Sequence, residues 1–169
     1  RDVQAKGGCL SRGDLASYRA EWAEPLSIPY RGGRIHAAPG LTGGPTLAAA
    51  LALLDAGGPP PDGGPGAVST LANARALHAA FDARLRGMGD HDSPKAPGCT
   101  THFSIVDRHG NMAAVTQTLL SIFGSRVVSP STGLLLNNGI LWFDPEPGKP
   151  NSLAPGKRCL ANYCPEPGN

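Results

Sequence analysis

The strongest structural signal in the sequence is Cys99-Thr100-Thr101-His102-Phe103-Ser104-Ile105-Val106-Asp107, followed by Met112-Ala113-Ala114-Val115-Thr116-Gln117-Thr118. The first segment is rich in aromatic and β-branched residues, and the second contains the β-branched Val115, Thr116 and Thr118. Such residues favour strands. Between them, residues 107–111 read Asp-Arg-His-Gly-Asn and supply the chemistry of a tight turn. The pattern predicts two adjacent antiparallel strands.

Thr100 and Thr118 are the first candidate site residues. Side chains alternate along a strand, so Thr116 and Thr118 share one face, from which Thr118 can reach Thr100 at the start of the other strand. A hydroxyl is a useful nucleophile only when a base takes its proton, and a threonine freed as a new N-terminus carries such a base in its α-amine. Cutting the Cys99–Thr100 bond would create that nucleophile. The alternative is that these threonines serve only as favourable strand residues.

Whole motifs of this chain resemble the γ-glutamyltransferase family, whose members are N-terminal-nucleophile hydrolases that cleave their own precursor. The resemblance is carried by residues 100–107, 110–111, 115–119, 123–125 and 131–138, and upstream by residues 7–18 and 24–26. It implies an α+β class and part of the four-layer αββα sandwich of these hydrolases. It also implies that residues 1–99 end the large subunit, with a linker near 87–99, and that residues 100–169 begin the small subunit.

Carried over position by position, the resemblance makes Thr100 the catalytic nucleophile, Cys99–Thr100 the self-cleaved bond and Thr118 the hydroxyl that positions the nucleophile. The expected function is that of an autoprocessing N-terminal-threonine amidohydrolase or acyltransferase. It would act on γ-glutamyl-like or other acyl amides through an acyl-enzyme on Thr100, which water or an acceptor amine resolves. The alternative is a catalytically inactive fragment or pseudoenzyme of the same family with a structural or interaction role.

The family's oxyanion glycine pair falls beyond Asn169, so the chain is expected to be a fragment that is inactive alone. The resemblance also implies that most of the large subunit lies upstream. Localisation is left open between a periplasmic or secreted protein and a cytoplasmic one.

The expected substrate pocket departs from that of the γ-glutamyl enzymes, whose polar and charged side chains grip the α-amino and α-carboxylate groups. The corresponding positions here are Leu120, Gly139, Trp142, Ala161 and Asn162. Leu, Gly, Trp and Ala cannot offer the ion pair or hydroxyl bonds that a zwitterion requires, and a buried unpaired charge is costly. Residues 142–158 look like the divergent branch of the family, that of γ-glutamyltransferase-like proteins and cephalosporin acylases. An apolar acyl pocket suits that branch better.

Composition argues against several other classes. The net charge is +2 and the basic residues are scattered, so no nucleic-acid partner is expected. No apolar run approaches the roughly 20 residues of a membrane span. The four cysteines and five histidines lack metal-ligand spacing, and neither a metal nor another cofactor is expected. Cys99 is predicted to leave with the large subunit as the residue before the cut.

Periodicity and turn residues predict the remaining elements. A helix is expected to start at Ser11 and to continue through Tyr18 and Trp22. A hairpin is expected over 26–37, a helix over about 46–56 after a closely packed Gly43-Gly44 pair, and a loop over 57–66. A second helix should carry one apolar face, formed by Val68, Leu71, Leu77, Phe81, Leu85 and Met88. His78 is interpreted as structural, and His91 and Asp92 as loop residues.

Overall fold

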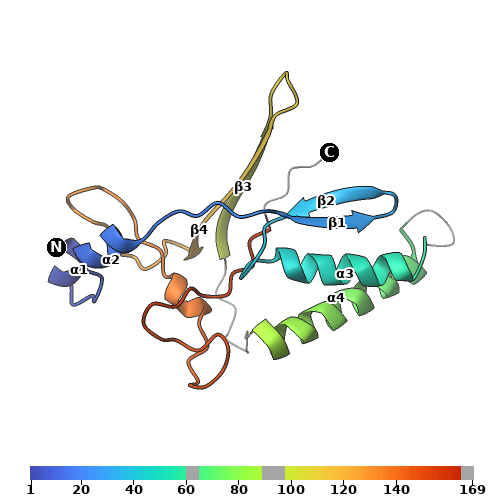
Figure 1. The fold of residues 1–169 in the computed structure, drawn as a ribbon. Helices are drawn as coiled ribbons and strands as arrows, with labels where there is room; N and C mark the ends of the chain where they lie inside the picture. Colours follow the sequence, from blue (N-terminus) through green and yellow to red (C-terminus); the bar gives the residue numbers. More distant parts are fainter. Residues whose placement is uncertain (60–64, 89–97, 165–169) are drawn as a thin grey trace. The chain divides into compact units, whose positions relative to one another are not determined.

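The computed structural model describes residues 1–59, 65–88 and 98–164. These residues form a mixed α+β structure of α-helices and two-stranded sheets, as predicted (Figure 1). They group into two compact units. The first contains residues 1–23, 98–101 and 117–139, and the second contains residues 24–59, 65–88, 102–116 and 140–164.

The core of the second unit lies between a hairpin and a helix. Strands β1 (Leu26–Tyr30) and β2 (Gly33–Ala37) pair antiparallel, and the hairpin runs along α3 (Gly44–Ala56) in Figure 1. Ile28, Ala37 and Leu51 form the buried cluster. Arg31 and Gly32 both have positive φ, at 49° and 81°, as a two-residue hairpin loop requires. The predicted hairpin is therefore confirmed.

The start of α3 depends on two glycines. A Cβ on Gly44 would collide with the carbonyl oxygen of Ala38, and a Cβ on Gly43 would lie 3.1 Å from the carbonyl oxygen of Asn162. Pro45 occupies the first turn, where its missing N–H leaves no intrahelical bond unmade. The expected close packing of the glycine pair is confirmed, and the helix begins at Gly44, slightly earlier than predicted.

Helix α4 (Ala67–Met88) is present, but it packs differently from the prediction. Its buried residues are Ala76, Ala80 and Arg84, spaced four apart on one face, and it packs against α3. Small alanines let two helix backbones approach closely, whereas larger side chains would hold them apart. Four residues of the predicted apolar face are exposed to solvent: Val68, Leu71, Leu77 and Phe81. His78 is also exposed.

The first unit contains the short helices α1 (Asp2–Ala5) and α2 (Arg12–Ser17). Ser11 caps α2 in a reciprocal capping box with Asp14, so the predicted start is confirmed. The predicted continuation is wrong: Tyr18 has an extended backbone, and Trp22 is fully exposed outside the helix. The Arg19 guanidinium donates to the carbonyl oxygens of Ala16 and Tyr18, which meets the acceptors left at the helix end.

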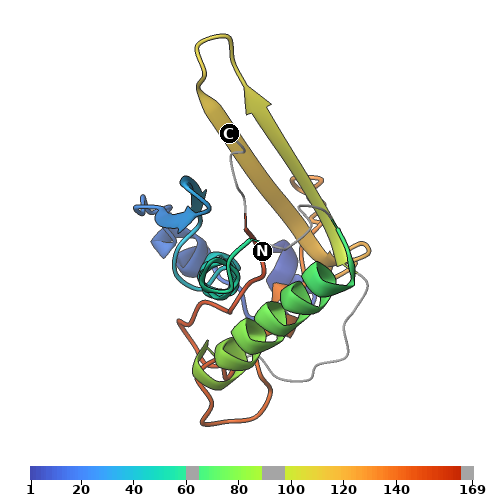
Figure 2. The same cartoon turned by 90° about the vertical axis from the view of Figure 1, so that its right-hand side faces the viewer.

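Strands β3 (Gly98–Val106) and β4 (Met112–Ser121) form the second two-stranded sheet, seen as one long hairpin in Figure 2. Asp107 closes its turn by accepting bonds from the His109 and Asn111 backbone N–H groups, at 2.8 and 2.9 Å. The Asn111 side chain also donates to Asp107, at 2.8 Å. This bond first, and then the two backbone bonds, lower the pKa of Asp107. The predicted strand pair is confirmed.

The predicted loop over 57–66 and linker over 87–99 lie partly outside the described residues, which exclude 60–64 and 89–97. His91 and Asp92 fall in the second of these gaps. Among the helices that the structure describes, none combines the length and the apolar character needed to cross a membrane.

Candidate active site

The open end of the β3–β4 hairpin carries the candidate nucleophile. The Thr100 hydroxyl donates a hydrogen bond to the Thr118 Oγ1 atom across the two strands, at 3.0 Å. Thr100 is exposed and Thr118 is half-buried. The contact expected from strand alternation is therefore present, and Thr100 combines access to solvent with a fixed oxygen-to-oxygen contact. Cys99 precedes Thr100 within β3.

The backbone just beyond Thr118 fixes the orientation of its side chain. The Leu120 N–H group donates to Thr118 Oγ1 at 2.9 Å, so this oxygen accepts from both Leu120 and Thr100. Leu120 itself has a φ of 73°, a left-handed conformation that non-glycine residues rarely adopt. Such a conformation persists only where surrounding contacts hold it.

Asn138 supplies those contacts. Its backbone N–H donates to the Leu119 carbonyl at 3.2 Å, its Oδ1 accepts from the Ser121 N–H at 3.1 Å, and its Nδ2 donates to Ser121 Oγ at 2.7 Å. These bonds tie the residues on both sides of Leu120. The following Gly139 donates its N–H to Asn137 Oδ1 at 2.9 Å. The structure thus brings two predicted pocket positions, Leu120 and Gly139, to the end of β4 next to Thr118.

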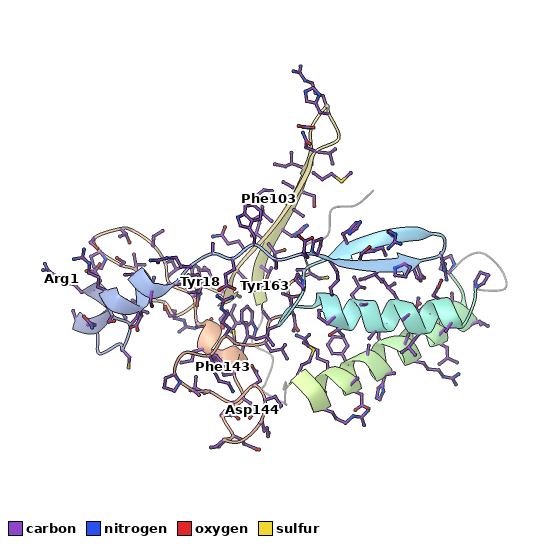
Figure 3. The ribbon with its side chains drawn as sticks, viewed as in Figure 1. Arg1, Tyr18, Phe103, Phe143, Asp144 and Tyr163 are labelled. Atoms are coloured by element: carbon purple, nitrogen blue, oxygen red, sulfur yellow. The ribbon has the colours of Figure 1, made fainter. Side chains whose placement is uncertain are left out.

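His102 adds a second polar contact across the hairpin. Its Nδ1 lies 2.8 Å from Thr116 Oγ1, and its Nε2 lies 3.1 Å from Ser104 Oγ. Both ring nitrogens are therefore engaged by hydroxyls on one strand face. Phe103, labelled in Figure 3, is the next residue along β3 and is 47% exposed.

The other predicted pocket positions lie in the second unit. Trp142 ends the 3-10 helix η1 (Gly139–Trp142). Its ring meets the ring of Tyr163, labelled in Figure 3, edge to face, with the two ring centroids 5.2 Å apart. Asn151, which is buried, donates to the Trp142 carbonyl at 2.6 Å and accepts from the Leu160 N–H at 2.9 Å. Asn151 and the ring contact together hold Trp142 beside the segment that contains Ala161.

Arg84 reaches the same segment from α4. Its Nη1 donates to the Thr42 carbonyl and Thr46 Oγ1, at 2.7 and 2.9 Å. Its Nη2 donates to the Ala161 carbonyl and Asn162 Oδ1, at 2.9 and 3.0 Å. Ala161 is buried and Asn162 is exposed.

Two titratable groups of this segment, Cys159 and Tyr163, have raised pKa values. Burial raises the pKa of the Cys159 thiol. Burial, followed by the nearby Cys159, also raises the pKa of the Tyr163 hydroxyl. A raised pKa makes the nucleophilic thiolate scarcer, so Cys159 does not have the character of a reactive cysteine. In the described parts of the chain, no cluster of three or more His, Cys, Asp or Glu side chains is placed to hold a metal ion.

Sequence reasoning missed three residues that hold these groups: Asn138, Asn151 and Arg84. The Asn137-Asn138 pair was part of the family resemblance, and a paired asparagine after three leucines is a usable signal. Nothing in the sequence distinguishes Arg84 from Arg86, which follows it in the same helix but is exposed and pairs with Asp82.

Comparisons with known proteins agree with one another. The family model described as Gamma-glutamyltranspeptidase matches residues 1–99 and 92–166. The Acylase ACY 1 proenzyme of Pseudomonas sp. (strain V22) is 31% identical, with 96% of this chain and 36% of that protein covered. The Glutathione hydrolase proenzyme of Escherichia coli (strain K12) is 28% identical, over 98% of this chain and 37% of that protein.

A solved structure, the cephalosporin acylase from Bacillus halodurans, matches with a TM-score of 0.71 and 27% identity, over 96% of this chain and 35% of that one. The likeness confirms the predicted α+β class and the N-terminal-nucleophile type of fold over the part covered. The chain spans about 36% of the length of the first curated relatives that it matches.

Proposed function

The chain belongs to the gamma-glutamyltranspeptidase family, and from that membership we propose that the whole protein is an autoprocessing amidohydrolase or acyltransferase with Thr100 as its nucleophile. The observation that carries the proposal is the 3.0 Å hydrogen bond from Thr100 Oγ1 to Thr118 Oγ1. The similarity to an acylase proenzyme and to a glutathione hydrolase proenzyme supports the class of reaction.

The first reaction is cleavage of the chain itself. The Thr100 oxygen attacks the Cys99 carbonyl carbon and loses its proton, and the C–N bond to Thr100 breaks as the nitrogen gains a proton. The product is an ester that joins Cys99 to the Thr100 oxygen. Water hydrolyses this ester, which leaves a carboxylate on Cys99 and a free α-amine and hydroxyl on Thr100.

The second reaction uses the amine that the first creates. The α-amine of Thr100 accepts the proton of its own hydroxyl while the oxygen attacks the carbonyl carbon of a substrate amide. The proton then passes to the leaving amine as the C–N bond breaks, and the acyl group remains on Thr100 as an ester. Water or an acceptor amine attacks this ester and restores the hydroxyl.

Thr118 acts in both reactions as a positioning residue. It accepts from Thr100 and is itself held by the Leu120 N–H group, so the nucleophile is kept in one rotamer before reaction. Preorganisation of this kind lowers the entropic part of the barrier. Asn138 bonds to Leu119 and Ser121, on both sides of Leu120, and so also fixes the backbone N–H group that holds Thr118.

The acyl group is proposed to have an apolar or singly charged end. Leu120, Gly139, Trp142 and Ala161 offer no side-chain charge for a zwitterion. Stripping water from an unpaired charge costs more than apolar contacts return.

The experiment that tests this function is capture of the acyl-enzyme. The purified whole protein is mixed with an aromatic acyl amide, quenched with acid and digested, and the masses of the peptides are measured by mass spectrometry. We expect the acyl mass on the peptide that begins with Thr100, and none in Thr100→Ala. Turnover without acyl mass on that peptide contradicts the mechanism, and neither turnover nor acyl mass favours the inactive-protein alternative.

A further inference from the structure

Arg84 is a buried cation that joins three segments far apart in sequence. It projects from α4 with 3% of its surface exposed. One of its terminal nitrogens bonds to residues at the entry to α3, Thr42 and Thr46, and the other bonds to Ala161 and Asn162. A buried charge is tolerated when hydrogen bonds replace its lost hydration, and four such bonds do so here.

Backbone contacts bring the same segments together independently of Arg84. The Ala161 N–H donates to the Leu41 carbonyl, and the Gly43 N–H donates to the Tyr163 carbonyl, both at 2.7 Å. Gly43 permits this approach, because a Cβ there would lie within 3.3 Å of three atoms of residues 162–164. Residues 161–163 are thus seated on the loop before α3, and the Arg84 guanidinium adds the contact that reaches the Asn162 side chain.

We propose that Arg84 is a positioning residue for the substrate pocket: it holds the Ala161–Asn162 wall through hydrogen bonds to both residues. The inference rests on the proposed function, because Arg84 precedes and Asn162 follows the Cys99–Thr100 bond. Cleavage of that bond leaves the two residues on separate polypeptides. The hydrogen bonds of Arg84 then join the products and keep the wall in register.

The chemistry of the side chain suits this task. A guanidinium presents its donors in a rigid planar fork, so one side chain can bond two acceptors on each side at fixed spacing. An ammonium has three donors at a single point. Lysine therefore preserves the charge but cannot reproduce contacts to both Thr46 and Asn162.

The test compares Arg84→Lys and Arg84→Met in the whole protein, with Arg86→Met as the matched control. Arg86 lies on the same helix, but its side chain is 74% exposed in a surface ion pair with Asp82. The first readout is amide hydrogen exchange in the peptide 159–164, with the peptide 26–37 as an internal reference. The second is the separation of KM from kcat on an aromatic acyl amide.

We expect exchange in 159–164 to be about tenfold faster in Arg84→Met, since hydrogen bonds to a charged group are lost, with a smaller increase in Arg84→Lys. KM should rise about tenfold while kcat stays within about threefold, because the pocket wall moves and the nucleophile does not. The reference peptide and Arg86→Met should stay at wild-type values.

Exchange in 159–164 that matches Arg86→Met in both Arg84 variants overturns the proposal. Faster exchange with an unchanged KM, or a uniform rise in exchange across both peptides, also overturns a positioning role. If Arg84→Met does not fold, Arg84→Lys decides by the same criteria. Failure of the proposed function is seen separately, as a wild-type protein that is neither cleaved nor active, and the exchange measurement does not depend on cleavage.

Discussion

At the scale of single residues, two threonines on the same face of β4 have different partners. Thr118 accepts from Thr100, whereas Thr116 lies 2.8 Å from His102 Nδ1. Thr118→Val keeps the shape and β-branching but removes the hydroxyl. We expect cleavage and turnover to slow by about 10- to 100-fold, the effect of losing one hydrogen bond worth ~1–3 kcal/mol in the transition state.

Thr116→Val is the matched control for this prediction. It removes the same group from the same strand, but its partner is not the nucleophile. Rates of processing and turnover in the two variants make the comparison. Equal losses would show that the integrity of the strand, and not the position of Thr100, was measured.

The same residues show how far sequence alone can go. Thr100 and Thr118 were predictable as a contact because strand alternation fixes which side chains share a face. The partners of Asn138, Asn151 and Arg84 depend instead on where loops return, and no local period records this. Arg84 and Arg86 are chemically identical and two residues apart, yet only Arg84 is buried.

At the scale of elements, helix α1 is attached to a loop of its own unit by a carboxylate. Asp2 Oδ2 accepts from the hydroxyls of Ser129 and Ser131, at 2.6 and 2.7 Å, and from the Ser131 N–H at 3.1 Å. These bonds, led by the one from the Ser129 hydroxyl, lower the pKa of Asp2 from 3.8 to about 2.

A depressed pKa makes this attachment dependent on pH. The stabilisation is present above the unfolded pKa of 3.8 and is lost as the pH falls toward about 2. We therefore expect Asp2→Asn to lower the urea midpoint of the whole protein at neutral pH, and the difference from wild type to vanish across that window. Glu24→Gln, on the exposed stretch before β1, serves as the control. A difference that persists unchanged down to about pH 2 would show that shape, not ionisation, mattered.

The entry to α3 allows a prediction about packing. A Cβ at Gly44 meets the Ala38 carbonyl, whereas a Cβ at Gly87 in α4 meets nothing within 4 Å. Gly44→Ala should destabilise the protein by about 1–3 kcal/mol through overpacking. Gly87→Ala should be neutral or stabilising by about 0.5–1 kcal/mol, because alanine favours the helix. Urea denaturation of both variants measures the difference, and equal effects would contradict the packing account.

Elements were predicted more accurately than their buried faces. The capping box at Ser11 located the start of α2, but the helix ends at Ser17 and Trp22 lies outside it. The side chain of Arg19 bonds to the carbonyls of Ala16 and Tyr18 at this end, a contact that no local period records. The pattern of large apolar residues correctly indicated α4. The residues of α4 that are buried are nevertheless Ala76, Ala80 and Arg84, and not the large apolar ones. Small alanines permit the close approach of two helices, whatever their hydrophobicity.

At the scale of the whole molecule, the pocket positions predict a substrate preference. Leu120, Gly139, Trp142 and Ala161 should reject a zwitterionic glutamyl end and accept an acyl group with an apolar or singly charged end. We expect kcat/KM to be higher for a glutaryl or aromatic acyl amide than for a γ-glutamyl anilide. A preference for the γ-glutamyl compound by about tenfold or more would mean that groups outside this chain supply the recognition.

The family and its type of fold follow from motifs that cover nearly the whole chain, and the family model matches residues 1–99 and 92–166. The division at Cys99–Thr100 remains a prediction. It cannot be read from packing, because compact units follow contacts in space and a processing site follows chemistry at a single peptide bond.

Thr100 is tested as the nucleophile by the intact mass of the purified whole protein, with sequencing of each N-terminus. We predict two polypeptides, the smaller beginning Thr100-Thr101-His102, and a single uncleaved chain for Thr100→Ala. A wild-type protein that stays in one piece and yet turns over substrate would contradict Thr100 as the nucleophile.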